Sequence, residues 1–355
     1  MKILVIQQKV IGDVLISSII CNNLKTEYPD AQIDYLVYDF TLPVLENNPN
    51  IDNIVVFDSK KHKNGLNLIL FALKIRKEKY DIVIDAYAKL ESGIITLLSG
   101  ANKRIGFKNK GLQIAYNTKV NHADEPKSFY GLAIERKISL FEQLIHKNNI
   151  DPYPKLFITD SEKEETNILF KKNGIDGDTD KVIIVSIFGS EASKTYPENY
   201  LSEVIDFVAA NFDVKILFNY TENQKEKAKK LFNTCNKLTQ EKIVFDLIGT
   251  DLRSLIKIVN NCNLMIGNDG GAINIAKSLQ KPTFTIFSPW IKKESWSVFE
   301  DGKNNIGIHV FDYFPELKQD LSAKELKENN NMFYNKLTPN LFMESLSNFL
   351  KDHLK

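Results

Sequence analysis

The first half of the chain alternates short aliphatic runs with longer segments whose apolar residues recur at helical spacing. Continuous runs of Ile, Val and Leu are typical of buried parallel strands, and the longer amphipathic segments are typical of helices. Strands are predicted at residues 3–6, 32–37, 53–57 and 81–85, and helices at 14–25, 66–77 and 136–144. This βαβ rhythm predicts a doubly wound parallel sheet of the α/β class.

The second half restarts this pattern after a linker at residues 149–154, which contains two prolines. Strands are predicted at 181–187, 214–218, 244–246, 264–266 and 283–287, and helices at 199–211, 224–232, 252–260 and 272–279. We expect a first domain over residues 1–155, a second over 156–325, and a helical tail over 326–355 that packs back across the domains.

Two predicted strand-to-helix turns carry residues that suit work on a phosphorylated substrate. The first contains Gly12 and Asp13, and the second contains Asp269, Gly270 and Gly271. Ligands of doubly wound sheets bind at the carboxyl ends of the strands, and free N–H groups at a helix N-terminus can hold phosphate. The pair of turns predicts a two-lobed enzyme. Asp13 has a second interpretation, as a carboxylate that caps its helix.

Composition narrows the functional class. The chain has 355 residues, 43% of them hydrophobic and 26% charged, which is typical of a globular protein with two domains. The formal net charge of +1 gives no support to nucleic-acid binding. Three scattered cysteines predict buried thiols, and Lys9 and Asp13 interrupt the N-terminal apolar run where a signal peptide would need continuity. We expect a cytoplasmic protein, one that can work at a membrane surface.

Several common enzyme signatures are absent from the sequence. A G-x-G-x-x-G motif does not follow the first strand, and the P-loop, G-x-S-x-G and H-E-x-x-H motifs are also missing, which disfavours a nicotinamide dehydrogenase. Residues 176–180 space their carboxylates as a metal-binding turn does, but a solvated loop before a strand is the better interpretation. No metal or cofactor is predicted.

Lys194 is the candidate for binding a diphosphate. It lies in the loop at residues 188–198, directly after the first predicted strand of the second half, and Ser190 lies in the same loop. A loop backbone and an ammonium group can face a diphosphate together. The alternative is an ordinary exposed lysine.

Three segments together resemble glycosyltransferase family 9, the bacterial lipopolysaccharide heptosyltransferases. Residues 2–37 are similar to the opening of that family. SKTYPENYL at 193–201 resembles its lysine-tryptophan-proline segment with Tyr196 in the aromatic place, and LMIGNDGGAINIAKSLQKPTFTIFSP at 264–289 resembles its second signature. The resemblance implies a GT-B architecture, two Rossmann-like domains facing across a cleft.

The resemblance also implies roles for single residues. Asp13 matches the proposed general base of the family, and Lys194 matches its diphosphate-contacting lysine. The implied donor-binding set is Gly12, Ser190, Lys194, Asp269, Gly270, Gly271 and Asn274. A carboxylate can take the proton of an acceptor hydroxyl, while a lysine and a helix N-terminus stabilise the leaving diphosphate without a metal.

The sequence departs from the family pattern at the donor site. Asn274 stands where histidine is usual, and Gly270 replaces threonine or serine. Asparagine donates a neutral hydrogen bond and carries no charge, so the identity of the donor stays open. Glu222 and Gln224 compete for the place of a family glutamate.

Acceptor-binding residues are predicted in the first half. Two basic clusters suit anionic lipid A and inner-core sugars, or are ordinary solvated surface. One consists of Lys60, Lys61, His62 and Lys63, and the other of Lys103, Arg104, Lys108 and Lys110. Ser92 matches a serine that the family places at the acceptor cleft. The predicted acceptor residues are Ser92, Lys61 and Arg104.

The leading hypothesis is therefore an inverting, metal-independent transferase that moves a heptose from ADP-heptose to a lipopolysaccharide core acceptor, with peripheral contact to the inner membrane. One alternative keeps the fold and uses a hexose nucleotide for another surface glycan. The other is a catalytically silent relative that binds sugar nucleotides.

Overall fold

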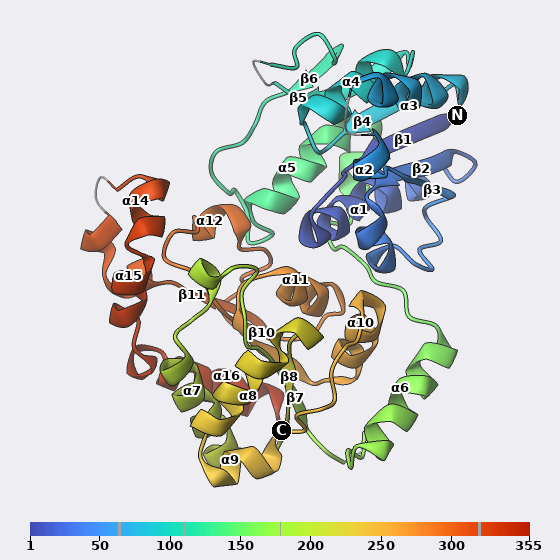
Figure 1. Cartoon of the computed structure of the whole chain (residues 1–355). Helices are drawn as coiled ribbons and strands as arrows, with labels where there is room; N and C mark the ends of the chain where they lie inside the picture. The colour runs from blue at the N-terminus through green and yellow to red at the C-terminus, as the bar shows by residue number, and fades with distance from the viewer. Residues whose placement is uncertain (63–64, 109–110, 178, 319–320) are drawn as a thin grey trace. The chain divides into compact units, whose positions relative to one another are not determined.

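The aliphatic runs of the first half form one parallel sheet in the order β3-β2-β1-β4-β5-β6 (Figure 1). Its strands are β1 (Lys2–Ile6), β2 (Gln32–Val37), β3 (Asn53–Val56), β4 (Ile82–Asp85), β5 (Lys103–Phe107) and β6 (Thr118–Val120). β1 pairs with β2 on one side and β4 on the other, and its residues from Ile3 to Ile6 are fully buried. Because β1 is buried on both faces, its residues from Ile3 to Ile6 are all apolar.

Helices accompany this sheet. They are α1 (Ile11–Glu27), α2 (Ser59–His62), α3 (Gly65–Lys77), α4 (Leu90–Leu98) and α5 (Leu132–Phe141), with short 3-10 turns at Asp39–Val44, Glu142–Leu144 and Lys147–Asn149. α3 packs against α4, and α1 packs against α5. α1 begins at Ile11, earlier than the predicted residue 14, because the amide of Val14 already donates to the carbonyl of Val10 at 2.9 Å. Asp13 therefore lies in the first turn of α1.

A second parallel sheet has the order β11-β10-β9-β7-β8. Its strands are β7 (Val182–Ser186), β8 (Lys215–Asn219), β9 (Leu264–Asn268), β10 (Thr283–Ile286) and β11 (Asn305–Ile308). The predicted strand at 244–246 is wrong, because the chain makes only a single bridge just before it, between Ile216 and Ile243, and then turns. The inner strand β5 and the edge strands β6 and β11 escaped prediction, since each is short and only partly buried.

The helices of the second half are α6 (Asp160–Lys172), α7 (Glu198–Asn211), α8 (Lys225–Thr234), α9 (Lys237–Lys242), α10 (Leu252–Asn261), α11 (Gly271–Ser278), α12 (Lys293–Trp296) and α13 (Val310–Tyr313). Short 3-10 turns lie at Ala192–Lys194, Glu222–Gln224 and Pro315–Lys318. A two-pronged ion pair fastens α6 to α10, with Arg253 Nε and NH2 each 2.7 Å from a Glu162 carboxylate oxygen. The contact lowers the pKa of Glu162 to about 2.

The tail folds as three short helices. They are α14 (Ala323–Glu328), α15 (Asn330–Lys336) and α16 (Met343–His353), with a 3-10 turn at Pro339–Leu341. α16 buries Leu346, Phe349 and Leu350 in the same core as the strands of the second sheet. Burial of its apolar stripe holds the tail on that core.

This computed structural model describes residues 1–62, 65–108, 111–177, 179–318 and 321–355. The chain divides into two units, Met1–Phe157 and Ile158–Lys355, and the tail belongs to the second. The three cysteines are buried free thiols, as predicted. Within the residues listed above, none of the helices combines the length and the apolar character that crossing a bilayer requires.

Candidate active site

Asp13 stands at the carboxyl edge of the first sheet, where β1 leads into α1. Gly12, beside it, is buried. Burial raises the pKa of the Asp13 carboxyl, while the ammonium of Lys137 and a hydrogen bond from the Val10 backbone oppose that rise. A partly desolvated carboxylate beside a positive charge is an environment suited to a general base.

Lys137 is a charged group at this edge that the sequence analysis missed. It projects from α5, and its Nζ donates to Gln7 Oε1 and to the carbonyl of Ala86, both at 2.9 Å. Burial lowers the pKa of Lys137 to about 8, although Asp13 and Asp85 favour its charged form. The residues after β1, the residues after β4 and the helix α5 thus meet at one ammonium group.

Asp85 organises the loop after β4. Its fully buried carboxylate accepts hydrogen bonds from the amides of Tyr87 at 3.1 Å and Ala88 at 2.9 Å, and from the Tyr116 hydroxyl at 2.7 Å. Burial raises the pKa of Asp85, and these donors oppose that rise. Because the donors occupy the carboxylate, Asp85 positions the loop around Lys137.

The predicted acceptor residues have structural partners in the first unit. Ser92 is fully buried at the start of α4, where its hydroxyl donates to the Lys89 carbonyl and accepts from the Lys89 amide, both at 3.0 Å. Arg104 on β5 donates to the carbonyls of Ala115 and Ala101. Lys61 is exposed and pairs with Asp58 at 3.7 Å. That Ser92, Arg104 and Lys61 contact an acceptor stays a prediction. Two other members of the basic clusters, Lys63 and Lys110, lie outside the residues that the structure describes.

In the second unit, Lys194 ends a short helical turn in the loop after β7. A side chain at Gly189 would place its Cβ 2.3 Å from the Lys194 carbonyl, so only glycine fits this tight loop. The Ser193 carbonyl accepts from the Ser288 hydroxyl at 2.7 Å and from Trp290 Nε1 at 3.1 Å. The Lys194 ammonium lies 5.2 Å from the centre of the Trp290 ring. The loop after β10 therefore fixes the backbone that carries Lys194.

The glycine-rich turn follows β9 and opens α11. Gly267 has a φ of +120°, and a Cβ there would lie 2.5 Å from the Ser186 carbonyl of β7, so both backbone conformation and space require glycine. The Asp269 amide donates to the Ile286 carbonyl at 3.1 Å. Burial raises the pKa of Asp269, and Lys194 and Lys277 oppose that rise. The fold thus brings Lys194 and Asp269 into electrostatic contact.

Lys277 is a second buried lysine that escaped the sequence analysis. Its Nζ donates to the Val298 carbonyl at 2.7 Å. Burial lowers the pKa of Lys277 to about 8, although Glu300 and Asp269 favour its charged form. Lys277 lies in the last turn of α11, and its positive charge acts on Asp269.

The departures from the family pattern lie on this turn. A Cβ at Gly270 would meet no atom within 4 Å, so the turn leaves open space there. Asn274 is half-buried in the first turns of α11.

Two other predicted positions lie away from this turn. Ser190 is exposed in the loop before Lys194. After β8, Gln224 Oε1 accepts from the Thr221 amide at 2.9 Å, and Glu222 is exposed; which of the two takes the place of the family glutamate stays open.

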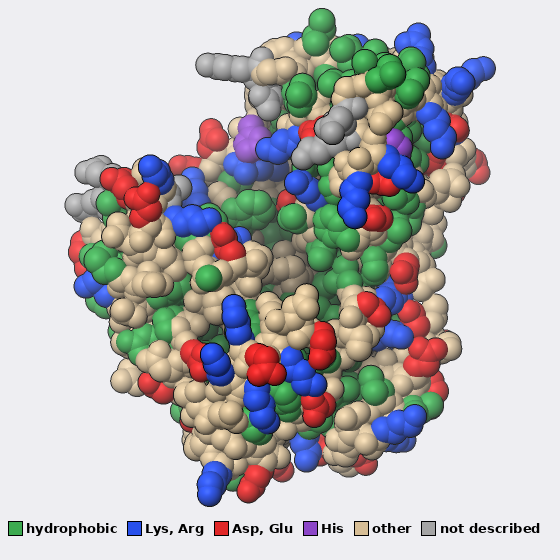
Figure 2. Space-filling model, in the orientation of Figure 1, with side chains coloured by type: hydrophobic (Ala, Val, Ile, Leu, Met, Phe, Trp, Pro, Cys, Tyr) green, Lys and Arg blue, Asp and Glu red, His purple; other side chains and the backbone are tan. Residues whose placement is uncertain are grey.

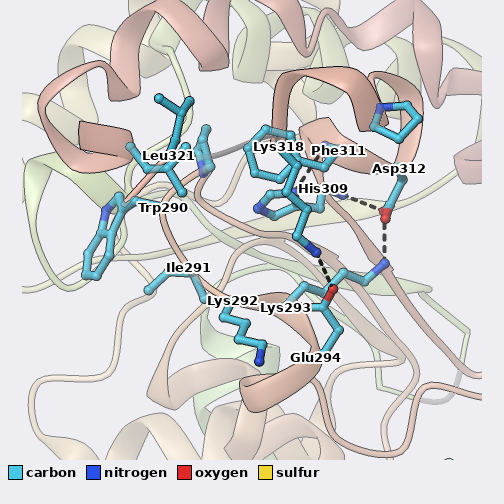
Figure 3. A pocket seen from close by; sticks show the side chains of 13 residues that line it. Trp290, Ile291, Lys292, Lys293, Glu294, His309, Phe311, Asp312, Lys318 and Leu321 are labelled. Atoms are coloured by element: carbon cyan, nitrogen blue, oxygen red, sulfur yellow. Dashed lines mark hydrogen bonds and ion pairs between the residues drawn. The ribbon is translucent and has the colours of Figure 1, made fainter. Parts of the chain in front are cut away.

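A separate cavity of about 380 Å³ borders Trp290 (Figure 3). Two of its lysines are paired, Lys293 with Asp312 at 2.9 Å and Lys318 with Glu294 at 2.8 Å, and exposed Lys292 lines the cavity as well. His309 Nδ1 accepts from the Phe311 amide, which directs its Nε2 hydrogen to the Ser288 carbonyl at 3.1 Å. Burial lowers the pKa of His309, consistent with this neutral form. We assign no ligand to this cavity.

Within the described residues, no group of three or more His, Cys, Asp and Glu side chains gathers as a metal site. Asp178, part of the carboxylate-rich segment 176–180, lies outside these residues.

Lys137→Met is expected to shift the acidic limb of the pH profile of kcat/KM to higher pH. The ammonium lowers the pKa of Asp13, so its removal raises the pH at which this carboxyl loses its proton. The profile should be measured against that of Lys119→Met, which removes an exposed lysine of the same unit. An unchanged acidic limb would show that Lys137 has only a structural role.

Comparison with known proteins identifies one family. The model of glycosyltransferase family 9 (heptosyltransferase) matches residues 70–319, most of the chain. Lipopolysaccharide heptosyltransferase 1 of Campylobacter coli is 25% identical over 295 residues, covering 81% of this chain and 84% of that protein.

Solved structures agree on the fold. A glycosyltransferase of family 9 from Veillonella parvula matches with a TM-score of 0.81 at 20% identity, covering 99% of this chain and 97% of its own. The Escherichia coli heptosyltransferase WaaC with ADP matches with a TM-score of 0.67 at 16% identity, covering 98% of this chain and 99% of that one. The two parallel α/β sheets are those of the GT-B fold. With a family model that spans most of its length, the chain belongs to glycosyltransferase family 9, the heptosyltransferase family, and is a glycosyltransferase.

Proposed function

We propose that the protein transfers a heptose, with inversion, from ADP-heptose to a lipopolysaccharide core acceptor. Membership of the heptosyltransferase family supports heptose as the sugar that is transferred. The Escherichia coli relative solved with ADP supports adenine as the nucleobase of the donor. The observation that carries the proposal is the pair of loops in the second unit. Ser288 and Trp290 fix the backbone beside Lys194, and the glycine turn that contains Asp269 leads directly into α11. Such a pair of loops offers positive charge and free amides to a diphosphate.

In this mechanism Asp13 accepts the proton of the acceptor hydroxyl as its oxygen bonds to the anomeric carbon of the donor. The bond from that carbon to the diphosphate oxygen breaks, and the nucleoside diphosphate leaves with the electron pair. Lys194 and the N-terminal amides of α11 stabilise the charge that develops on the leaving group. Gly12, Ser190, Gly270, Gly271 and Asn274 complete the proposed donor site.

We further propose that transfer needs no metal ion, because an ammonium group and a helix N-terminus already face the leaving group. The first unit, with Asp13 and the predicted acceptor residues Ser92, Lys61 and Arg104, is proposed to bind the acceptor. The second unit is proposed to bind the donor. We also propose that the reaction takes place in the cytoplasm, where the protein meets its acceptor at the inner face of the bacterial membrane.

A donor screen tests the proposal. The purified protein is offered ADP-heptose and a panel of ADP-, UDP- and GDP-hexoses, and thermal shift and nucleotide release are followed with a core-oligosaccharide acceptor, with and without EDTA. We expect selective stabilisation and release with ADP-heptose, unchanged by EDTA. Release from a hexose nucleotide would favour the alternative that Gly270 and Asn274 leave open. Binding without release from any donor would favour a catalytically silent relative.

A further inference from the structure

The helix α3 carries apolar residues on two opposite faces. Leu68, Phe71, Ala72 and Ile75 are buried in the core of the first unit. On the other side, Leu66, Ile69, Leu70 and Leu73 are 69%, 43%, 54% and 41% exposed. Their spacing of three, four and seven residues places these four side chains in one stripe along the helix. A surface helix ordinarily turns a polar face outward, so this outer stripe needs an occupant.

The charge around the outer stripe indicates which occupant. Lys74, Arg76 and Lys77 are exposed on the same helix, and the helix contains no acidic residue. Lys74 and Lys77 follow Leu70 and Leu73 by one helical turn, so their side chains flank the stripe and its C-terminal end. α4, which packs against α3, adds exposed Leu97. Figure 2 shows hydrophobic side chains at the surface over α3 and α4, beside Lys and Arg side chains.

We propose that the outer stripe of α3 docks the first unit onto an anionic lipid bilayer. Leucine and isoleucine side chains enter the boundary between headgroups and acyl chains, while lysines reach back to the anionic headgroups. A protein partner is a poorer match, because lysine is depleted from the apolar centres of protein interfaces. The inference assigns a surface to the membrane contact that the leading hypothesis only named, and none of the residues proposed for donor binding or catalysis lies on α3.

Vesicle flotation with the full-length protein tests this docking surface. Vesicles of phosphatidylcholine mixed with phosphatidylglycerol are compared with vesicles of phosphatidylcholine alone. We expect the protein to float with the anionic vesicles and to be released as salt is added, because salt screens the lysine contacts. Equal flotation with both vesicles, or none with the anionic vesicles, would overturn the proposal.

Variants locate the surface. Leu70→Gln and the double variant Lys74→Gln/Lys77→Gln are each expected to weaken vesicle binding by about tenfold. Leu238→Gln, at a 51% exposed leucine of α9, is the matched control and should bind as the wild type does. Leu66→Gln repeats the test at the other end of the stripe if Leu70→Gln lowers the Tm.

Two further readouts separate this proposal from others. Turnover of a water-soluble acceptor should be the same for Leu70→Gln and the wild type, and a failure of the proposed function would leave the flotation result standing. Light scattering tests whether a second copy of the chain covers the stripe. The lipid assignment would be overturned if the wild type formed a dimer that Leu70→Gln dissociates. It would also be overturned if the Leu70→Gln variant floated with the vesicles as well as the wild type does.

Discussion

Asp13→Asn is expected to lower kcat by about 10²–10⁴-fold while donor binding persists, because the amide cannot take the proton of the acceptor hydroxyl. Burial raises the pKa of this carboxyl, and the neighbouring ammonium of Lys137 opposes that rise by favouring the charged form. Steady-state release of the nucleoside diphosphate measures turnover, and calorimetric titration with the donor measures binding.

The control for Asp13→Asn is Asp160→Asn, which removes a carboxylate from the first turn of α6. A carboxylate that only interacts with the helix dipole contributes about 0.3–1 kcal/mol to stability and nothing to turnover. If Asp13 were such a group, both variants would lower the Tm slightly and retain kcat. Wild-type turnover in Asp13→Asn would therefore remove this residue from catalysis.

Lys194→Ala is expected to cost roughly 2–4 kcal/mol across donor binding and transfer, provided that the ammonium contacts the diphosphate in a desolvated site. This corresponds to a fall in kcat/KM of about 30- to 1000-fold. The expectation rests on the position of Lys194, which lies beside Trp290 and acts electrostatically on Asp269. Donor titration and kcat/KM divide the loss between binding and the chemical step.

Lys327→Ala is the matched control for Lys194→Ala. Lys327 also lies over the Trp290 ring, at 4.5 Å, but its ammonium pairs with Glu191 at 3.0 Å on the surface. An exposed ion pair contributes about 0–1 kcal/mol, so donor affinity should change little. Equal losses in the two variants would mean that general charge around Trp290, and not a diphosphate contact by Lys194, attracts the donor.

The sequence by itself predicted the elements that local pattern encodes. The apolar runs that became β1 and β2 lie in parallel strands buried on both faces, where most residues are apolar, and their bounds were predicted within one residue. The turns that carry Asp13 and Asp269 were also found, because a strand, a turn residue and a helix follow one another directly along the chain. Their functional roles came from the resemblance and stay predictions.

The edges of the sheets depended on tertiary structure. Residues 244–246 have the composition of a strand but form none, and only Ile243 before them makes a single bridge. In contrast, β11, with Gly307 in its short sequence, completes the second sheet. A strand at an edge is defined by the neighbour with which it pairs, and that neighbour is not visible in the local pattern.

The electrostatics of the candidate site also required the fold. Lys137 bonds to Gln7, which is 130 residues away, and to Ala86, which is 51 residues away. Lys277, in the last turn of α11, interacts electrostatically with Asp269. Burial raises or lowers a pKa according to which distant groups surround the side chain, so a lysine of α5 looks like any helical lysine until the helix is packed. The sequence determined which residues can perform chemistry, and the tertiary structure decided which charges they face.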